Sequence, residues 1–159
     1  MNPVLRMLQA RIGRPPGPRA APFTRWLQGV IRGVEEGAVS VEFLVRDDMT
    51  NPAGLLHGGV QAAMIDEVIG MTVASLGADT FFVSVNLAID HLGQARAGDT
   101  VRAAGRIHRA GRKVINAGCD LMDPTGRLIA RGSSNLLKTT MVPDYITRLQ
   151  AREREATDE

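Results

Sequence analysis

One stretch, residues 51–75, constrains the fold more than any other part of the chain. It consists of NPAGLLHGGVQAAMIDEVIGMTVAS, a turn followed by two glycines and a nearly unbroken apolar run. From Val60 to Ala74 almost every residue is apolar or small, and this pattern predicts a helix that is enclosed on most sides. The rest of the chain must therefore supply the surface that covers this helix.

The predicted helix also carries a carboxylate pair, Asp66 and Glu67. A buried ionised carboxylate costs free energy unless it is paired or used, so the pair needs an explanation. Gly59, at the helix start, precedes Asp66 by seven positions, and at 3.6 residues per turn the two fall within about twenty degrees of one face. Since the first N–H groups of a helix bind carbonyl oxygens and anions, that face combines such donors with a carboxylate.

Strand-like patterns lie on both sides of the helix. Residues 23–34 and 38–45 form the first two runs, with Gly37 in the turn between them, where its backbone freedom suits a hairpin. Four more runs follow the helix, at residues 80–92, 100–109, 113–122 and 127–137. Short separators predict that neighbouring strands pair antiparallel as a meander. We therefore predict an α+β fold in which one antiparallel sheet wraps around the long central helix.

Alternation within the first of these later strands predicts which side chains share a face. The more polar face would hold Phe82, Ser84, Asn86, Ala88 and Asp90, and the other Val83, Val85, Leu87 and Ile89.

The length of 159 residues suits one domain with tails. We expect a helix and a proline-rich linker over residues 1–22, the main domain over residues 23–140, and a charged tail, helical or frayed, over residues 141–159. The central helix needs a cover on its second side, and another copy of the chain is the simplest one. We therefore expect a homodimer, assembled further as a dimer of dimers.

Composition argues against several classes of partner. With 4% aromatic residues and a net charge of +2, the chain lacks the features of a nucleic-acid-binding protein. No run approaches the roughly twenty apolar residues of a membrane span, and the N-terminus has no signal-peptide pattern. The single cysteine, Cys119, excludes an internal disulfide and suits a small buried residue in a cytoplasmic protein. His57, His91 and His108 lack the spacing of metal ligands.

The central stretch and a later one together resemble a known family. Asn51 stands six positions before His57 and Asp66 nine after it, and SVNLAIDHLGQARAGD follows in the next strand. This pattern is similar to that of hotdog-fold acyl-CoA thioesterases of the phenylacetate-degradation (PaaI-like) type, from about Asn51 to Leu137. The resemblance implies hydrolysis of an acyl-CoA to a carboxylic acid and coenzyme A. It implies no cofactor, because coenzyme A is part of the substrate.

The same resemblance implies roles for individual residues. Asp66 would act as general base or as nucleophile, and the N–H of Gly59, next to Gly58, would polarise the thioester carbonyl. Asn51 and His57 would shape the site, with His57 positioning the substrate or water rather than transferring protons. Ser84 would come from the neighbouring subunit and help to hold the water.

Elementary chemistry agrees with these roles. Negative charge develops on the carbonyl oxygen, where preorganised N–H donors stabilise it. A carboxylate in an apolar pocket has a raised pKa and is a better base, so we expect this of Asp66. Basic and hydroxyl side chains suit the phosphates of coenzyme A. The candidates are Arg109, Arg112, Lys113, Arg131, Ser133 and Ser134.

Two other functions stay open at this point. The first is a non-catalytic module that binds acyl-CoA, although such a module would not need Asp66. The second is an acyl-CoA hydratase or dehydratase, although no histidine follows Asp66 on the helix. Glu67 also remains a competitor for the catalytic role.

Overall fold

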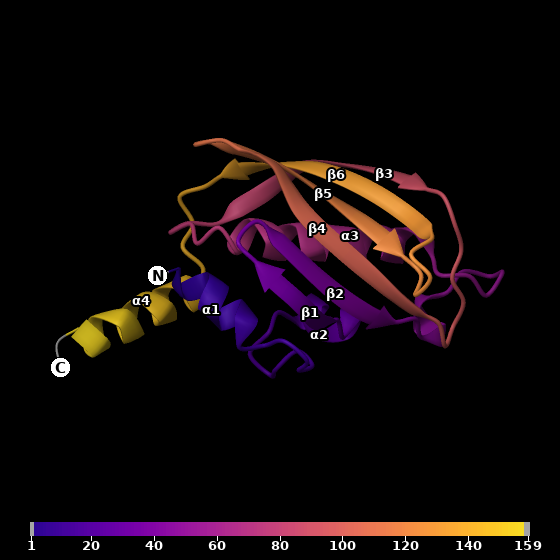
Figure 1. Cartoon of the computed structure of the whole chain (residues 1–159), viewed down its shortest axis with the longest axis horizontal. Helices are drawn as coiled ribbons and strands as arrows, with labels where there is room; N and C mark the ends of the chain where they lie inside the picture. Colours follow the sequence, from indigo (N-terminus) through magenta and orange to yellow (C-terminus); the bar gives the residue numbers. More distant parts are fainter. Residues whose placement is uncertain (1, 158–159) are drawn as a thin grey trace.

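A six-stranded antiparallel sheet curls around one long helix, α3 (Gly58–Ala74) (Figure 1). The computed structural model describes residues 2–157, apart from the side chains of residues 153, 154, 156 and 157. The strands are β1 (Val30–Glu35), β2 (Ala38–Leu44), β3 (Phe82–His91), β4 (Thr100–Ala110), β5 (Val114–Met122) and β6 (Leu128–Lys138). Their order in the sheet is β1-β2-β4-β5-β6-β3, and the predicted α+β hotdog architecture is confirmed.

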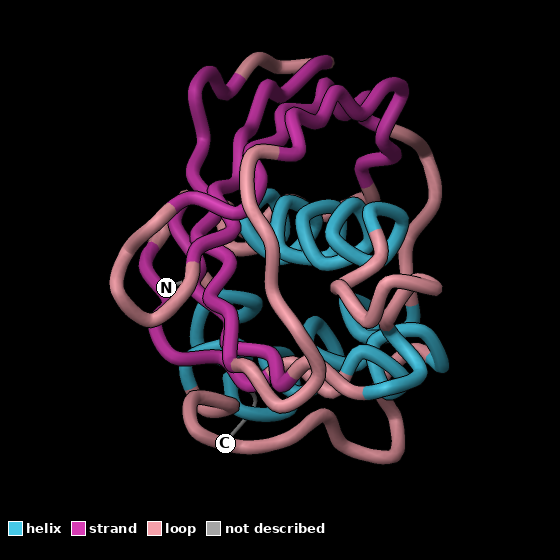
Figure 2. Tube along the Cα trace, turned by 90° about the vertical axis from the view of Figure 1, so that its right-hand side faces the viewer, coloured by secondary structure: helices cyan, strands magenta, loops and turns pink. Residues whose placement is uncertain are grey.

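Shorter helices cover the side of α3 that faces away from the sheet (Figure 2). They are α1 (Pro3–Gln9), α2 (Pro22–Leu27) and α4 (Asp144–Thr157), and the short 3-10 helix η1 (Asp47–Met49) precedes the turn before α3. The first and last elements of the described chain, α1 and α4, contact each other. Among the described residues, no helix has the length and apolar character that crossing a bilayer requires.

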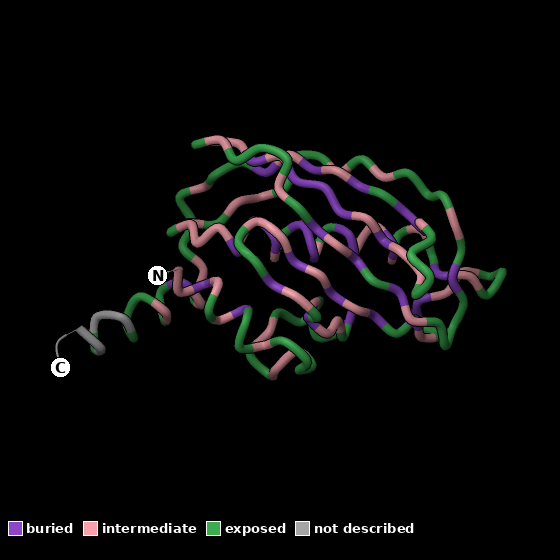
Figure 3. The backbone as a smooth tube through the Cα atoms, in the orientation of Figure 1, coloured by how far each residue is buried: buried purple, intermediate pink, exposed green. Residues whose placement is uncertain are grey.

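The apolar run of α3 forms the centre of the core. Buried segments follow α3 and the middle strands, whereas the loop before α3 is exposed (Figure 3). Met64, Ile65, Val68 and Ile69 are fully buried against the sheet. Burying such side chains stabilises the fold by about 1.5–3 kcal/mol each, so this face of α3 holds the helix and the sheet together.

One strand prediction was wrong at its start. Residues 23–34 were expected to be extended, but Pro22–Leu27 forms α2 and the strand begins only at Val30. Pro22 occupies the first turn of α2, where its missing N–H costs nothing, and Gln28 ends the helix with a left-handed φ of 56°. The aromatic rings of Phe23 and Trp26, one helical turn apart on α2, stack with their centroids 5.8 Å apart.

The predicted meander is also wrong in one place. Strands β4, β5 and β6 do pair in sequence, but β3 pairs with β6 rather than with β4. The segment after β3 crosses the end of the sheet instead, where the N–H groups of Leu92 and Gly93 bond to Ile129 O and Ala95 O accepts from Leu56. This crossing makes β3 an edge strand and brings the chain beside the start of α3.

A bulge in β3 overturns the predicted alternation. The pairing with β6 shifts between Ser84 and Asn86, because an extra residue at this point leaves the ladder. As a result, Phe82 and Leu87 both pack against the core, although strict alternation would separate them. Val85 is 59% exposed. The bulge therefore lets Ser84 turn toward α3 while Leu87 still joins the core.

Candidate active site

The turn before α3 is held by Asn51 and His57. The Oδ1 atom of Asn51 accepts hydrogen bonds from the N–H groups of Ala53 and Leu55, at 3.0 and 3.1 Å. His57 is the N-cap of α3, and its Nδ1 accepts from the N–H of Gly59 at 2.9 Å. In this structure the Gly59 donor, expected to face a thioester oxygen, is thus engaged by the histidine ring. A carbonyl oxygen would have to replace that ring.

A second polar pair at the helix start was missed by the sequence reasoning. The Nδ1 atom of His91 lies 2.8 Å from Oε1 of Gln61, and Nε2 of Gln61 donates to Leu56 O at 3.0 Å. A Cβ at Gly58 would come within 3.2 Å of the His91 ring, so a glycine gives the ring its space. The sequence feature that could have indicated this pair is Gln61, a polar residue within an apolar run. Its partner on β3 could not be read from spacing.

Asp66 and Ser84 meet within one chain. The Ser84 hydroxyl donates to Oδ1 of Asp66 at 3.1 Å, and both residues are exposed. Two expectations differ from this arrangement. Ser84 was expected to reach the site from a neighbouring subunit, but the bulge in β3 brings it to its own Asp66. The carboxylate was expected in an enclosed apolar pocket, and in the single chain it lies open.

Glu67, the neighbour of Asp66, faces a different environment. Helical rotation of about 100° per residue turns it away from Asp66, and its side chain lines a cavity under α3. Loss of solvent raises the pKa of Glu67, a hydrogen bond from Thr24 opposes this, and the charge of Asp66 adds to it. Glu67 is therefore the more deeply enclosed of the two carboxylates.

The β4–β5 hairpin carries three of the candidate coenzyme ligands. Arg109, Arg112 and Lys113 are exposed, and the hairpin lies at the end of the molecule opposite to the start of α3 (Figure 1). Hydrogen bonds from Gly37 to Ser75 and from Ile107 to Gly37 tie this end of β4 to the C-terminal end of α3. Within one chain, the hairpin is therefore far from Gly59.

The other coenzyme candidates on β6 already have partners. Arg131 makes two hydrogen bonds to Asp120, at 2.6 and 3.0 Å. Ser134 is fully buried, and its hydroxyl donates to Asn86 O at 2.7 Å. Ser133 lies with Arg131 in a small depression of the sheet. The structure thus gives Arg131 and Ser134 contacts that hold neighbouring strands together.

Cys119 has the environment of a core residue. It is 2% exposed, and burial, with a smaller contribution from the charge of Asp120, raises the pKa of its thiol to about 12. A thiol of this kind stays protonated and is a poor nucleophile. Among the described residues, no three His, Cys, Asp or Glu side chains gather in a group that could bind a metal ion.

The exposed face of α3 and the edge strand β3 form one open surface. Gly59, Asp66 and Gly70 are exposed along α3. Beside them, Val85 on β3 and Leu92 just after it are each 59% exposed. An unpaired edge strand with exposed apolar side chains is typical of a surface that another chain covers.

Comparisons with known proteins identify the family. The family model described as thioesterase superfamily matches residues 53–130. Acyl-coenzyme A thioesterase 13 of Homo sapiens is 30% identical over 97 residues, which cover 60% of this chain and 69% of the human one. A phenylacetic acid degradation-related protein from Ralstonia eutropha JMP134 is 32% identical, with a TM-score of 0.72, and covers 86% of this chain and 99% of its own.

A third similarity concerns the fold alone. The hypothetical thioesterase protein of Streptococcus pneumoniae TIGR4, solved with coenzyme A, has a TM-score of 0.67 at 23% identity and covers 72% of this chain and 88% of its own. The helix-wrapping sheet, the HGG turn at the start of α3 and the two relatives at or above 30% identity lead to one conclusion. The chain belongs to the thioesterase superfamily, among the hotdog-fold acyl-CoA thioesterases of the phenylacetate-degradation type.

Proposed function

We propose that this protein hydrolyses an acyl-CoA thioester to a carboxylic acid and coenzyme A, with Asp66 as general base or nucleophile. The observation that carries the proposal is the hydrogen bond from Ser84 to Asp66 on the open face of α3. The similarity to a human acyl-coenzyme A thioesterase supports the choice of substrate. No second function is favoured by an observation of comparable weight.

The chemistry needs few groups. In the general-base route, Asp66 takes a proton from a water molecule as that water adds to the carbonyl carbon, and the carbon–sulfur bond then breaks. In the nucleophilic route, Asp66 attacks the carbon, the carbon–sulfur bond breaks to leave an anhydride between Asp66 and the acyl group, and water then hydrolyses that anhydride and frees Asp66. In both routes coenzyme A leaves with a proton as the thiol. Ser84 fixes the orientation of one carboxylate oxygen, so the other oxygen is left to face water or substrate. Fixing a catalytic group in this way lowers the barrier to reaction.

The oxyanion donor and the carboxylate belong, in this proposal, to two different chains. Seven residues at a rise of 1.5 Å separate Gly59 from Asp66 by about 10 Å along the axis of α3. That backbone separation is long for one thioester carbonyl to bridge, because its carbon and oxygen are little more than an ångström apart. An antiparallel second copy of α3 would place its Gly59 near this Asp66. The proposed site is therefore shared between subunits, in place of the single-chain half-site that the helical spacing suggested.

The same assembly gives the β4–β5 hairpin a role. With the start of the partner's α3 beside Asp66, in the middle of this chain's α3, the hairpin that carries Arg109, Arg112 and Lys113 lies beyond the C-terminal end of this α3, where the far end of a long coenzyme A molecule could lie. We place the phosphates of the substrate there rather than at Arg131, which is paired with Asp120. Replacing Arg112 and Lys113 by alanine should raise KM and leave kcat unchanged, since these residues would bind substrate and transition state equally. An unchanged KM would exclude the hairpin as the phosphate site.

The test of the proposed function measures thiol release from a panel of aryl- and alkyl-CoA thioesters. We expect Asp66→Asn to lower kcat by at least about a hundredfold without changing the oligomeric state. Glu67→Gln is the matched control one residue away, and it should retain turnover. Full activity of Asp66→Asn, or equal loss in both variants, would contradict the assignment.

A further inference from the structure

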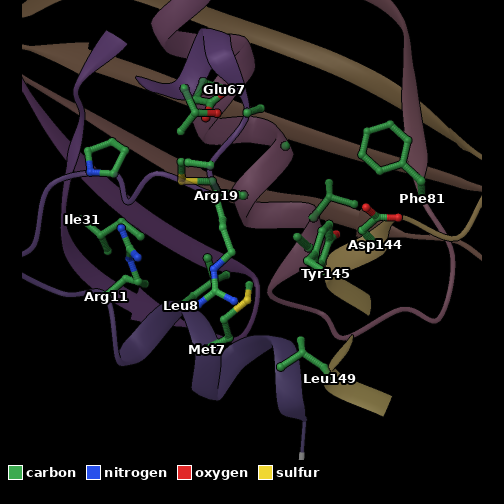
Figure 4. Close-up of a pocket in the computed structure, with 18 of the residues that line it drawn as sticks. Met7, Leu8, Arg11, Arg19, Ile31, Glu67, Phe81, Asp144, Tyr145 and Leu149 are labelled. Carbon is green, nitrogen blue, oxygen red and sulfur yellow. The ribbon is translucent and has the colours of Figure 1, made fainter. Parts of the chain in front are cut away.

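A cavity of about 780 Å³ lies between α3 and the terminal segments. Its walls come from α1, the linker that follows it, α4, and the face of α3 that carries Glu67, Gly70 and Met71 (Figure 4). Neither Asp66 nor Ser84 lines it. The cavity is therefore distinct from the proposed catalytic pair, although Glu67 and Gly70 adjoin that pair on the helix.

The walls suit an aliphatic chain. Met7 and Leu8 of α1, Phe81 and Leu149 line the cavity (Figure 4), and Met71 of α3 also belongs to its lining. Volumes of roughly 300–1,000 Å³ with mostly apolar walls are usual for sites that enclose small molecules. Methionine side chains adapt to flexible ligands because they are unbranched and polarisable. An extended apolar chain would thus find contacts along its whole length.

The charges around the cavity are predominantly positive. Its lining includes five arginines but only two carboxylates, those of Glu67 and Asp144. Asp144 already pairs with Arg148 at 3.4 Å. The guanidinium groups of Arg14 and Arg19 make no ion pair or hydrogen bond with the described residues. The cavity therefore offers cations without partners at the edge of an apolar chamber, which suits an anionic head group.

The position of Glu67 favours one orientation of a ligand in the cavity. Figure 4 shows Glu67 on one side of the cavity, with Arg11, Met7 and Leu8 on the other. An anionic head would be repelled beside Glu67 and attracted to the arginines of the linker. The tail would then extend along α3 toward Phe81.

Gly70 keeps the space along α3 open. A Cβ built on Gly70 would meet nothing within 4 Å, although the residue lies in the middle of a helix. Glycine in that position lowers helix stability relative to alanine. A larger side chain would fit without a clash within the chain, but it would project into the cavity.

We propose that this cavity is a second binding site, for an aliphatic carboxylate of medium or long chain, with its head on Arg14 and Arg19 and its tail along α3. The site does not depend on the proposed thioesterase reaction. Its ligand chemistry, a linear chain with an anionic head, is available both as a free fatty acid and within a substrate acyl group. We commit to the free acid, because the unpaired arginines would contact a carboxylate that an acyl thioester lacks.

The test is calorimetric titration of the full-length protein with dodecanoate below its micellar concentration. We expect saturable binding to the wild type. The double variant Arg14→Ala/Arg19→Ala should bind about tenfold more weakly or worse, since two charge-assisted contacts are lost. Met71→Trp, at a residue of α3 that lines the cavity and is not on the exposed face, should abolish binding by filling the chamber. Arg102→Gln, which removes an exposed arginine of β4 that does not line the cavity, is the matched control and should bind normally.

Competition separates the two sources of the ligand. Coenzyme A and a non-hydrolysable dodecyl-CoA thioether should both leave dodecanoate binding unchanged if the site is separate. Displacement by the thioether would assign the cavity to the substrate's acyl group and overturn the second site. Absence of saturable binding to the wild type would overturn it as well. Unchanged dodecanoate binding in both cavity variants would also overturn the second site. Circular dichroism would confirm that each variant is folded.

Discussion

At the scale of single residues, Asp66 and Glu67 show how one step along a helix changes the surroundings of a carboxylate. The exposed Asp66 receives a hydrogen bond from Ser84, whereas Glu67 is turned into the cavity under α3. The sequence motif could select Asp66 as the reactive group. It could not show which carboxylate is enclosed, because that depends on the terminal segments and on the bulge in β3.

The enclosed carboxylate predicts a pH effect on stability. Burial holds the pKa of Glu67 above its ordinary value of 4.5, so the folded chain binds this proton more tightly than the unfolded chain does. The favourable contribution of protonated Glu67 to the free energy of unfolding is therefore complete when the pH is below the ordinary pKa. It is lost as the pH rises through the pKa of Glu67 in the folded state. Glu67→Gln should therefore raise Tm relative to the wild type at neutral pH, and the difference should vanish in acid. Thermal melts between pH 4 and about 8 measure this. A difference that is independent of pH would refute it.

At the scale of elements, the start of α3 depends on His57 as its cap. The imidazole accepts the N–H of Gly59, a role more often filled by Asn, Asp or Ser. We expect His57→Ala to lower the free energy of unfolding by about 1 kcal/mol. His57→Asn should restore most of that stability while removing the ring. Equal losses in the two variants, measured by urea unfolding, would show that packing of the ring rather than capping matters.

The helix and the sheet approach each other most closely at glycines of the strands. A Cβ at Gly105 of β4 would overlap Oγ1 of Thr72 and come within 3.1 Å of Val68, both on α3. Gly105→Ala should therefore cost about 1–3 kcal/mol. Because Thr72 Oγ1 is the nearest atom, the cost should be smaller in a Thr72→Ala background, which a double-mutant cycle would detect. If the stability losses of Gly105→Ala and Thr72→Ala are additive, the strain at Gly105 does not come from contact with Thr72.

Elements with strong local signals could be predicted from the sequence. The apolar run of α3 and the alternating patterns of β2, β4, β5 and β6 are encoded within each segment, so their existence and approximate bounds are confirmed. The helix α2 was missed because its aromatic residues favour strands locally. The pairing of β3 with β6 and the bulge at Val85 were missed because both depend on contacts between distant segments.

At the scale of the whole molecule, one chain leaves its proposed chemistry incomplete. Asp66 lies open on α3, the neighbouring edge strand carries exposed Val85, and the Gly59 donor is about 10 Å away along the helix. A second copy packed antiparallel on this surface would cover the apolar side chains and bring a Gly59 to each Asp66. In the proposed function, each active site is therefore built from two chains.

Activity of a mixed assembly tests that claim most directly. Asp66→Asn removes the carboxylate, and Gly59→Pro removes the N–H donor at a position in the first helical turn where proline is tolerated. Each variant alone should be inactive. A heterodimer isolated through two different affinity tags contains one intact site if the site is shared, so we expect turnover to return to about half of the wild-type value. A heterodimer as inactive as its parents, with the wild-type mass and fold, would contradict the shared site.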